Sequence, residues 1–448
     1  MEPSPNRSRI TGYFYLLSLS LLLLGLAFGV LASLQYVFPG FIREYLSFER
    51  TRPLHVSPVI FWIILTAAGT VFNYLSQHTR KEIYSARLLT ASLLLFGITL
   101  LIILTLYLNG IFGGREYWEF PPLLAIPIGL GWLLLLINFI RSLASFKQQP
   151  VYIWMWITGL VFFLFTFLES YLWIFPYFRS HVINDMTIQW KSYGSMVGCW
   201  NMLIYGSSIF LMDKITGNQN NSHSRLAFTL YYIGLFNLMF NWGHHIYTLP
   251  GHRFVQYISY GVSMTELLLL GRIIYHWRDT LTAAQKYFHR GAYRFLMAAD
   301  VWIFLNLTLA ILMSIPAINL YTHGTHVTVA HTMGTTIGIN TMLLLAFVVD
   351  YCLEINQDFN KYNKWIRAGF WVANAGLFVF WISFIAAGIF KSQWQMAAAP
   401  ASFREMMDSL RPFFATALIA GTCIAAGLEM IIFPALFSLF KRQRPGAI

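Results

Sequence analysis

The stretch "RPLHVSPVIFWIILTAAG", residues 52–69, decides the fold class of this chain. After Arg52 and His55 the sequence continues as a nearly unbroken apolar run, and a helix needs roughly 20 such residues to cross a hydrocarbon core about 30 Å thick. Similar runs recur throughout the 448 residues, of which 57% are hydrophobic and 11% charged, whereas soluble domains usually carry about a quarter charged residues. The sequence therefore predicts a polytopic membrane protein.

We expect an all-α membrane protein in which about twelve transmembrane helices form one bundle, a single polytopic domain over residues 1–448. A transmembrane barrel would instead show short segments of alternating hydrophobicity. The predicted spans are 11–38, 54–76, 87–111, 121–140, 151–175, 189–212, 226–248, 256–276, 294–316, 326–352, 367–390 and 412–440.

The net charge of +12 is distributed unevenly between the two sides of the predicted bundle. With twelve spans both termini lie on one side, and that side carries 20 of the 30 Lys and Arg residues. Basic residues are enriched in cytoplasmic loops, so we expect both termini in the cytoplasm. Because the basic excess follows from topology, we expect no nucleic-acid partner.

Ionisable side chains within the spans are functional candidates because their burial in lipid is costly. His55 lies at the outer end of the second span and suits either a heme ligand or an interfacial hydrogen-bonding role. Arg52, one turn earlier, is placed to meet an anionic group such as a heme propionate. His244 and His245 lie near the outer end of the seventh span, in "FNWGHHIYTLP", residues 240–250.

Adjacent side chains on a straight helix diverge by roughly 100°, so the two histidines bind one metal only if the backbone is irregular. Gly243 and Pro250 favour such an irregularity. We therefore consider His244 and His245 as candidate ligands of a single metal ion.

The stretch "YTHGTHVTVAHTMGTTIG", residues 321–338, begins the tenth span and contains His323, His326, His331 and Met333. His331 and Met333 are two residues apart and point to nearly opposite helix faces, so one helix can ligate two hemes. Imidazole and thioether are both axial ligands of heme iron, although a methionine in an apolar helix more often only packs.

Two carboxylate-bearing segments complete the candidates. The outer loop "GGREYWEFP", residues 113–121, contains Glu116 and Glu119, which solvation alone would explain. Glu266 is different because it lies inside the eighth span, where it needs a protonated state, a proton path or a metal. The histidine-rich positions all fall in the outer half of the bundle, so we expect one site that holds several metals.

These motifs together resemble the large, heme-bearing subunit of bacterial nitric oxide reductase, a member of the heme-copper oxidase superfamily, over nearly the whole chain. The resemblance implies a low-spin heme b on His55 and a high-spin heme b on His331, whose segment also holds His323 and His326. It implies a non-heme iron or copper on His244 and His245.

The resemblance also implies a role for three further features. In the cytochrome-c-dependent branch, the glutamate matched by Glu116 binds a calcium ion between heme propionates. Glu266 matches a buried glutamate near the non-heme metal, with a role in proton delivery or metal coordination. We expect a small membrane-anchored cytochrome c subunit as electron donor, a diatomic gas as substrate, and the bacterial inner membrane as location.

The chain departs from the family pattern at two places. The family has a second histidine where this chain has Met333, which implies a His55/Met333 heme with a raised reduction potential. The family's third metal histidine and its metal-binding glutamate align with Gly194 and Gly198. A third ligand would then have to come from Tyr193, Lys191 or water.

Three functions are consistent with this pattern. The first is reduction of nitric oxide to nitrous oxide, and the second is nitric oxide dismutation or oxygen reduction on the same scaffold. The third is a non-enzymatic heme protein that transfers electrons or senses a diatomic gas. A stoichiometric metal on His244 and His245 would distinguish the enzymes from the third class.

Overall fold

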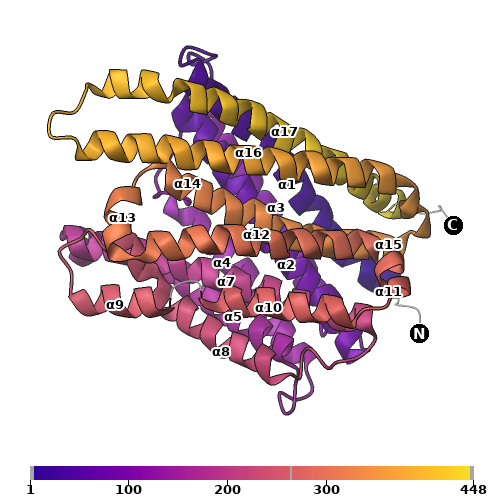
Figure 1. Ribbon diagram of the computed structural model, residues 1–448. Helices are drawn as coiled ribbons and strands as arrows, with labels where there is room; N and C mark the ends of the chain where they lie inside the picture. Colours follow the sequence, from indigo (N-terminus) through magenta and orange to yellow (C-terminus); the bar gives the residue numbers. More distant parts are fainter. Residues whose placement is uncertain (1–4, 263–264, 444–448) are drawn as a thin grey trace.

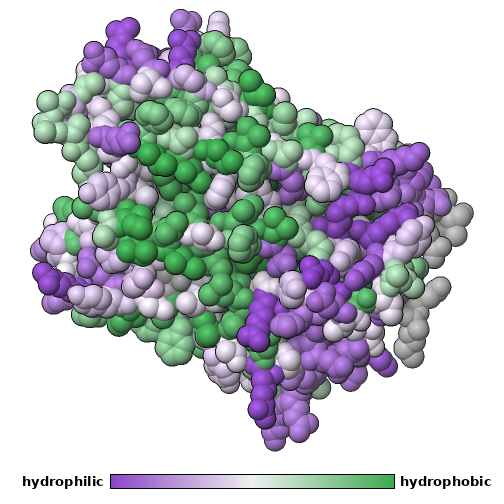
Figure 2. All heavy atoms as spheres, viewed as in Figure 1, coloured by the Kyte–Doolittle hydropathy of each residue, from purple (hydrophilic) through white to green (hydrophobic). Residues whose placement is uncertain are grey.

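The protein is a bundle of long helices, seen in a computed structural model that describes residues 5–262 and 265–443 (Figure 1). The described part contains no β-strand, and ten of its helical segments are long and apolar enough to cross a membrane. Hydrophobic side chains occupy the middle of the face shown in Figure 2, and hydrophilic ones gather toward its ends. The predicted all-α membrane fold is confirmed.

The elements follow one another with short connections. They are α1 (Pro5–Val37), α2 (Phe48–Thr79), α3 (Ala86–Leu108), η1 (Pro122–Leu124), α4 (Ala125–Ser142), α5 (Val151–Glu169), η2 (Leu172–Ile174), α6 (Pro176–Arg179), α7 (Val182–Thr216), α8 (Arg225–Phe240), η3 (Asn241–Ile246), α9 (Arg253–Val262), α10 (Thr265–Thr280), α11 (Ala283–Phe288), α12 (Arg290–Ser314), α13 (Pro316–Thr322), α14 (His326–Met333), η4 (Gly334–Thr341), α15 (Met342–Ile355), η5 (Gln357–Tyr362), α16 (Asn363–Met396) and α17 (Phe403–Gln443).

Polar caps set the start of several helices. The hydroxyl of Ser85 accepts from the backbone N–H of Leu88 at the start of α3, and Ser224 does the same for Ala227 in α8. Thr325 caps α14 in the same way. Each cap satisfies a backbone donor that the first helical turn leaves free, and so fixes the register of the helix that follows.

Two of the twelve predicted spans are absent from those ten segments. The span predicted at 226–248 is α8 followed by η3, a 3₁₀ turn that contains His244 and His245. The span predicted at 256–276 falls on α9 and α10. The backbone at the histidine pair is thus irregular, as its Gly243 suggested.

The most buried helices lie at the centre of the bundle. In α2, in α7 and in the segment from α14 to α15, 83% of the most apolar stretch is buried, compared with 33% in α3. α1 packs along α2, α5 along α7, and α16 along α17. The start of α1 and the end of α17 lie at the same end of the bundle (Figure 1). The central helices are therefore the ones that can enclose a site away from lipid.

Candidate functional site

A cavity of about 280 Å³ lies between the central helices α2, α7 and α14, with η3 and η4 completing its wall. Its lining includes His55, His244, His245, His331 and Met333. These residues are up to 278 positions apart in the chain, from 55 to 333, and only the packing of three elements, α2, η3 and α14, brings them to one place. The cavity is the candidate functional site.

The ring of His55 packs against α1 and is hydrogen-bonded to it. Its Nδ1–H donates to the backbone carbonyl of Gly25 over 2.7 Å. A Cβ on Gly29 would lie 2.7 Å from the same nitrogen, so a glycine is required for the ring to approach α1 this closely. Metal-ligating histidines commonly donate their second ring nitrogen to such an acceptor, which fixes the tautomer that leaves Nε2 free to bind.

His244 and His245 lie side by side on η3. Their ring centroids are 4.1 Å apart, and Trp190 of α7 stacks on His245 with centroids 5.0 Å apart. The Nδ1 of His244 lies 2.9 Å from the side-chain oxygen of Asn241. The backbone of η3 departs from a regular α-helix, and in this irregular segment the two adjacent rings lie against each other.

The side of the cavity facing this pair has no room for the missing ligands. A Cβ on Gly194 would lie 2.7 Å from Cβ of Trp242, and one on Gly198 would lie 2.9 Å from Cα of Leu238. Lys191 is ion-paired with Glu169. Within the part of the chain that the structure describes, no three His, Cys, Asp or Glu residues form a group that could hold a metal ion.

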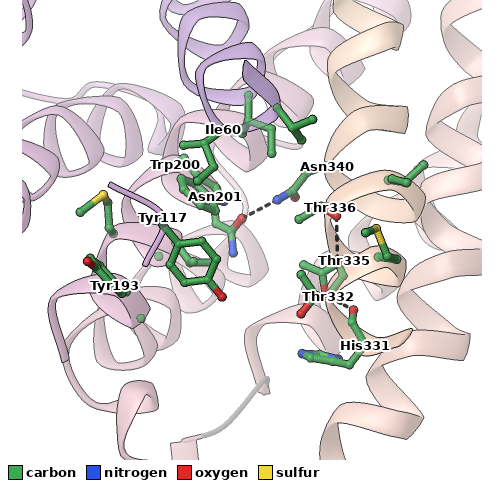
Figure 3. A pocket seen from close by; sticks show the side chains of 18 of the residues that line it. Ile60, Tyr117, Tyr193, Trp200, Asn201, His331, Thr332, Thr335, Thr336 and Asn340 are labelled. Atoms are coloured by element: carbon green, nitrogen blue, oxygen red, sulfur yellow. Dashed lines mark hydrogen bonds between the residues drawn. The ribbon is translucent and has the colours of Figure 1, made fainter. Parts of the chain in front are cut away.

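His331 and Met333 reach the cavity from the end of α14, where the helix continues as the π-helix η4. Figure 3 shows the His331 ring directed into the cavity. Thr335, one turn further, donates its hydroxyl to the backbone carbonyl of His331 over 3.1 Å. A π-helical turn is often found at functional sites because it shifts side chains out of regular register.

The loop over residues 113–121 covers the cavity on the opposite side. Tyr117 and Trp118 both line it, and the Tyr117 hydroxyl points into it in Figure 3. Tyr117 has a φ of 72°, a left-handed conformation that is uncommon for a bulky residue. Its ring meets that of Tyr193 with centroids 5.4 Å apart, and burial raises the pKa of Tyr117 to about 12.

Tyr117 is not among the candidate residues that the sequence indicates. Its only signal was an aromatic residue inside a loop of charged ones. Tyr193, which the sequence analysis did consider, lines the cavity and is 6% exposed.

Arg52 fastens this loop to α2. Its guanidinium donates to Glu116 over 2.7 Å and to Glu119 over 2.6 Å. Burial raises the pKa of Glu119, and the charge of Arg52 opposes that shift. Arg52 thus pairs with two carboxylates of the chain itself, so a propionate or a calcium ion at Glu116 would have to share these partners.

Two further predicted site residues, His323 and His326, are not among the residues that line the cavity. His326 begins α14 and packs against Phe384 and Phe414, with ring centroids 5.6 and 5.0 Å away. His323 precedes α14, and burial lowers its pKa. The backbone of Glu266 belongs to α10, but its side chain is outside the described part of the structure.

The polar atoms around the cavity suit a bound prosthetic group. Four buried atoms of lining residues have no hydrogen-bond partner: Trp118 Nε1, Trp200 Nε1, Asn237 Oδ1 and Asn340 Oδ1. Leaving such atoms unsatisfied costs about 1–3 kcal/mol each. A largely apolar macrocycle with carboxylate arms, such as heme, fits this lining, with His55 and His331 as imidazole donors. The pair on η3 offers only two donors to a second metal.

Comparisons with known proteins match most of the chain. Residues 9–423 match the family described as "Cytochrome C and Quinol oxidase polypeptide I". A nitric oxide reductase subunit of Stutzerimonas stutzeri is 22% identical over 94% of this chain and 92% of that protein. Cbb3-type cytochrome c oxidase subunit CcoN1 of the same organism is 23% identical over 92% and 90%.

A solved structure has the same fold. A heme-copper terminal oxidase dimer, determined by cryo-electron microscopy, aligns with a TM-score of 0.74 over 99% of this chain and 85% of that one, at 14% identity. The relatives are named for different reactions at nearly equal identity, so the comparisons identify a family rather than a reaction.

Proposed function

Because the chain belongs to the cytochrome c and quinol oxidase polypeptide I family, we propose that it is the heme-bearing subunit of a membrane oxidoreductase that reduces nitric oxide. The observation that carries the proposal is the convergence of His55, His244, His245, His331 and Met333 on one cavity. In this reaction two nitric oxide molecules, two electrons and two protons yield one nitrous oxide and one water.

The chain's residues divide into three roles under this proposal. His55 and Met333 hold a low-spin heme b that receives electrons, and His331 holds the high-spin heme b. His244 and His245 hold a non-heme iron or copper beside it. When bound, these metals supply redox equivalents and orient and polarise the gas molecules.

Other side chains shape the space in which the gases meet. Tyr117 and Tyr193 cover the cavity at the loop side, where they limit access of bulk water. Tyr193 lines the cavity and is next to Gly194 in sequence, and so is our candidate catalytic residue on α7. Glu266 is the candidate for proton delivery, and Glu116 for a calcium ion.

The proposal also includes a membrane location and an electron donor. The distribution of basic residues supports cytoplasmic termini. A bacterial inner-membrane location follows from the resemblance, and hemes toward the outer half follow from where the histidines fall in the predicted spans. Electrons would come from a small membrane-anchored cytochrome c subunit.

A non-enzymatic gas-binding or electron-transfer protein is the second candidate. Its supporting observation is the close packing at Gly194 and Gly198, which leaves the histidine pair without a third protein ligand among the described residues. Nitric oxide dismutation and oxygen reduction on this scaffold would need a working second metal as well.

The test is the iron, copper and heme content of the purified protein, followed by nitric oxide turnover with isotopic product analysis. We expect two hemes and one further metal per chain, with labelled nitrous oxide as product. Labelled dinitrogen and oxygen would instead indicate dismutation. Two hemes without a further metal, together with no turnover, would refute the proposal in favour of the second candidate.

Two variants test whether the further metal is bound by His244 and His245. The double variant His244→Ala/His245→Ala should lose the additional metal and retain both hemes. His326→Ala is the matched control because its ring packs against Phe384 and Phe414 and is not part of the cavity lining. We expect this control to keep the full metal content.

A further inference from the structure

Asn306 of α12 lies directly behind the ring of His331. It is fully buried and uses both ends of its amide. Its Nδ2 donates to the backbone carbonyl of His331 over 3.1 Å and to the hydroxyl of Thr335 over 2.8 Å. Its Oδ1 accepts from the indole N–H of Trp381, on α16, over 3.2 Å. The same Nδ2 lies 3.3 Å from Nδ1 of His331.

The neighbours fix which way this amide points. The indole of Trp381 can only donate, and the backbone carbonyl of His331 can only accept. A reversed amide would face its NH₂ toward the indole N–H and its oxygen toward the carbonyl. Two hydrogen bonds, each worth about 0.5–1.5 kcal/mol, would be replaced by repulsive contacts. The NH₂ group therefore stays toward His331.

This environment differs from that of the other candidate heme ligand. Nδ1 of His55 finds the carbonyl oxygen of Gly25 at 2.7 Å, which is an acceptor. Nδ1 of His331 finds an amide NH₂, which is a donor. Among the described residues, no oxygen is hydrogen-bonded to the His331 ring. An acceptor at Nδ1 makes an imidazole a stronger metal ligand, so the two histidines are set up unequally.

We propose that Asn306 is a positioning residue that keeps His331 a weak axial ligand, by presenting a donor where an acceptor would strengthen it. The inference rests on the proposed function, in which Nε2 of His331 binds iron and Nδ1 carries the ring proton. With heme bound, a donor at Nδ1 would make His331 the weaker of the two histidine ligands, and so the one that a strong ligand such as nitric oxide would displace more readily.

The test is the iron–histidine stretching band in the resonance Raman spectrum of the fully reduced, gas-free protein. Asn306→Asp supplies a carboxylate acceptor to Nδ1, so we expect the band to move to higher frequency. Asn306→Leu removes the donor beside Nδ1 of His331 without adding an acceptor, and leucine has nearly the same size as asparagine. We expect a shift in the same direction, and this second variant serves if the first does not fold.

The chain provides a matched control. Asn374 of α16 accepts from the indole of Trp302 on α12 over 2.9 Å, the same pairing between the same two helices. It has no contact with His331, so Asn374→Asp should leave the band unmoved.

Two results would overturn the inference, and they differ. An unshifted band in both Asn306→Asp and Asn306→Leu, with heme content retained, would show that the amide does not influence the bond between His331 and iron. A band that persists in His331→Ala would show that His331 is not the ligand, which would also overturn that part of the proposed function.

Discussion

Adding a single methyl group at Gly194 should destabilise the protein. The new Cβ would lie 2.7 Å from Cβ and 3.0 Å from Cα of Trp242, whereas carbon atoms in optimal contact are about 3.5–4.0 Å apart. The overlap of about 1 Å is with Cα and Cβ, so no side-chain rotation relieves it and α7 must move away from η3. Overpacking of this kind typically costs about 1–3 kcal/mol.

The assay is the unfolding midpoint of purified Gly194→Ala in detergent, measured beside Gly129→Ala. Gly129 is also in a membrane-spanning helix, but a Cβ there would lie 4.0 Å from its nearest neighbour, on Phe167. The control should match or exceed native stability, because alanine favours a helix by about 1 kcal/mol over glycine. Equal stability of the two variants would refute the idea that α7 touches η3 tightly at this point.

The same contact determines what restoring a ligand would do. Gly194→His brings an imidazole to the position at which the resemblance places the third metal ligand. Because its Cβ meets the same backbone, we expect lower stability than Gly194→Ala and no gain in bound metal. A variant of native stability that binds one more equivalent of iron would contradict this reasoning.

Three further perturbations test the loop, the low-spin heme and the proton path. Burial raises the pKa of Glu119, so the folded state holds the proton more tightly and the free energy of unfolding falls as pH rises from about 4.3 to the folded pKa. Arg52→Gln removes the charge that opposes this shift, so the unfolding midpoint should fall further, and over a wider pH range, between acid and neutral pH. A pH profile unchanged from that of the native protein would refute this prediction. Met333→His should keep a low-spin spectrum and lower the potential of the His55 heme in a redox titration, whereas an unmoved potential would make Met333 a packing residue only. Glu266→Gln should abolish turnover with full heme content, and surviving activity would exclude a role in proton delivery.

Much of the fold follows from local properties of the sequence. Runs of apolar residues must be helical in lipid, because only a helix satisfies every backbone polar group within one segment. The predicted span limits at 54–76 and 189–212 accordingly fall within α2 and α7. The prediction was less accurate at 226–248, where the helix gives way to a 3₁₀ turn, because hydropathy reports burial and not backbone geometry.

The candidate donors can also be read from the pattern of residues. An imidazole in an apolar segment is costly whatever surrounds it, so His55, His244, His245 and His331 stand out among their hydrophobic neighbours. The sequence also shows the departure from the family pattern at Gly194, where a glycine stands in place of the third metal histidine.

Only the tertiary structure decided how these residues relate to one another. In the structure Arg52 is ion-paired with Glu116 and Glu119. The Tyr117 hydroxyl points into the cavity, and His326 is not among the residues that line it. The tertiary structure also placed Asn306, an ordinary amide on a distant helix, behind His331. Such contacts depend on how helices pack side by side, and that packing is set by many weak contacts distributed over the whole chain rather than by any local pattern.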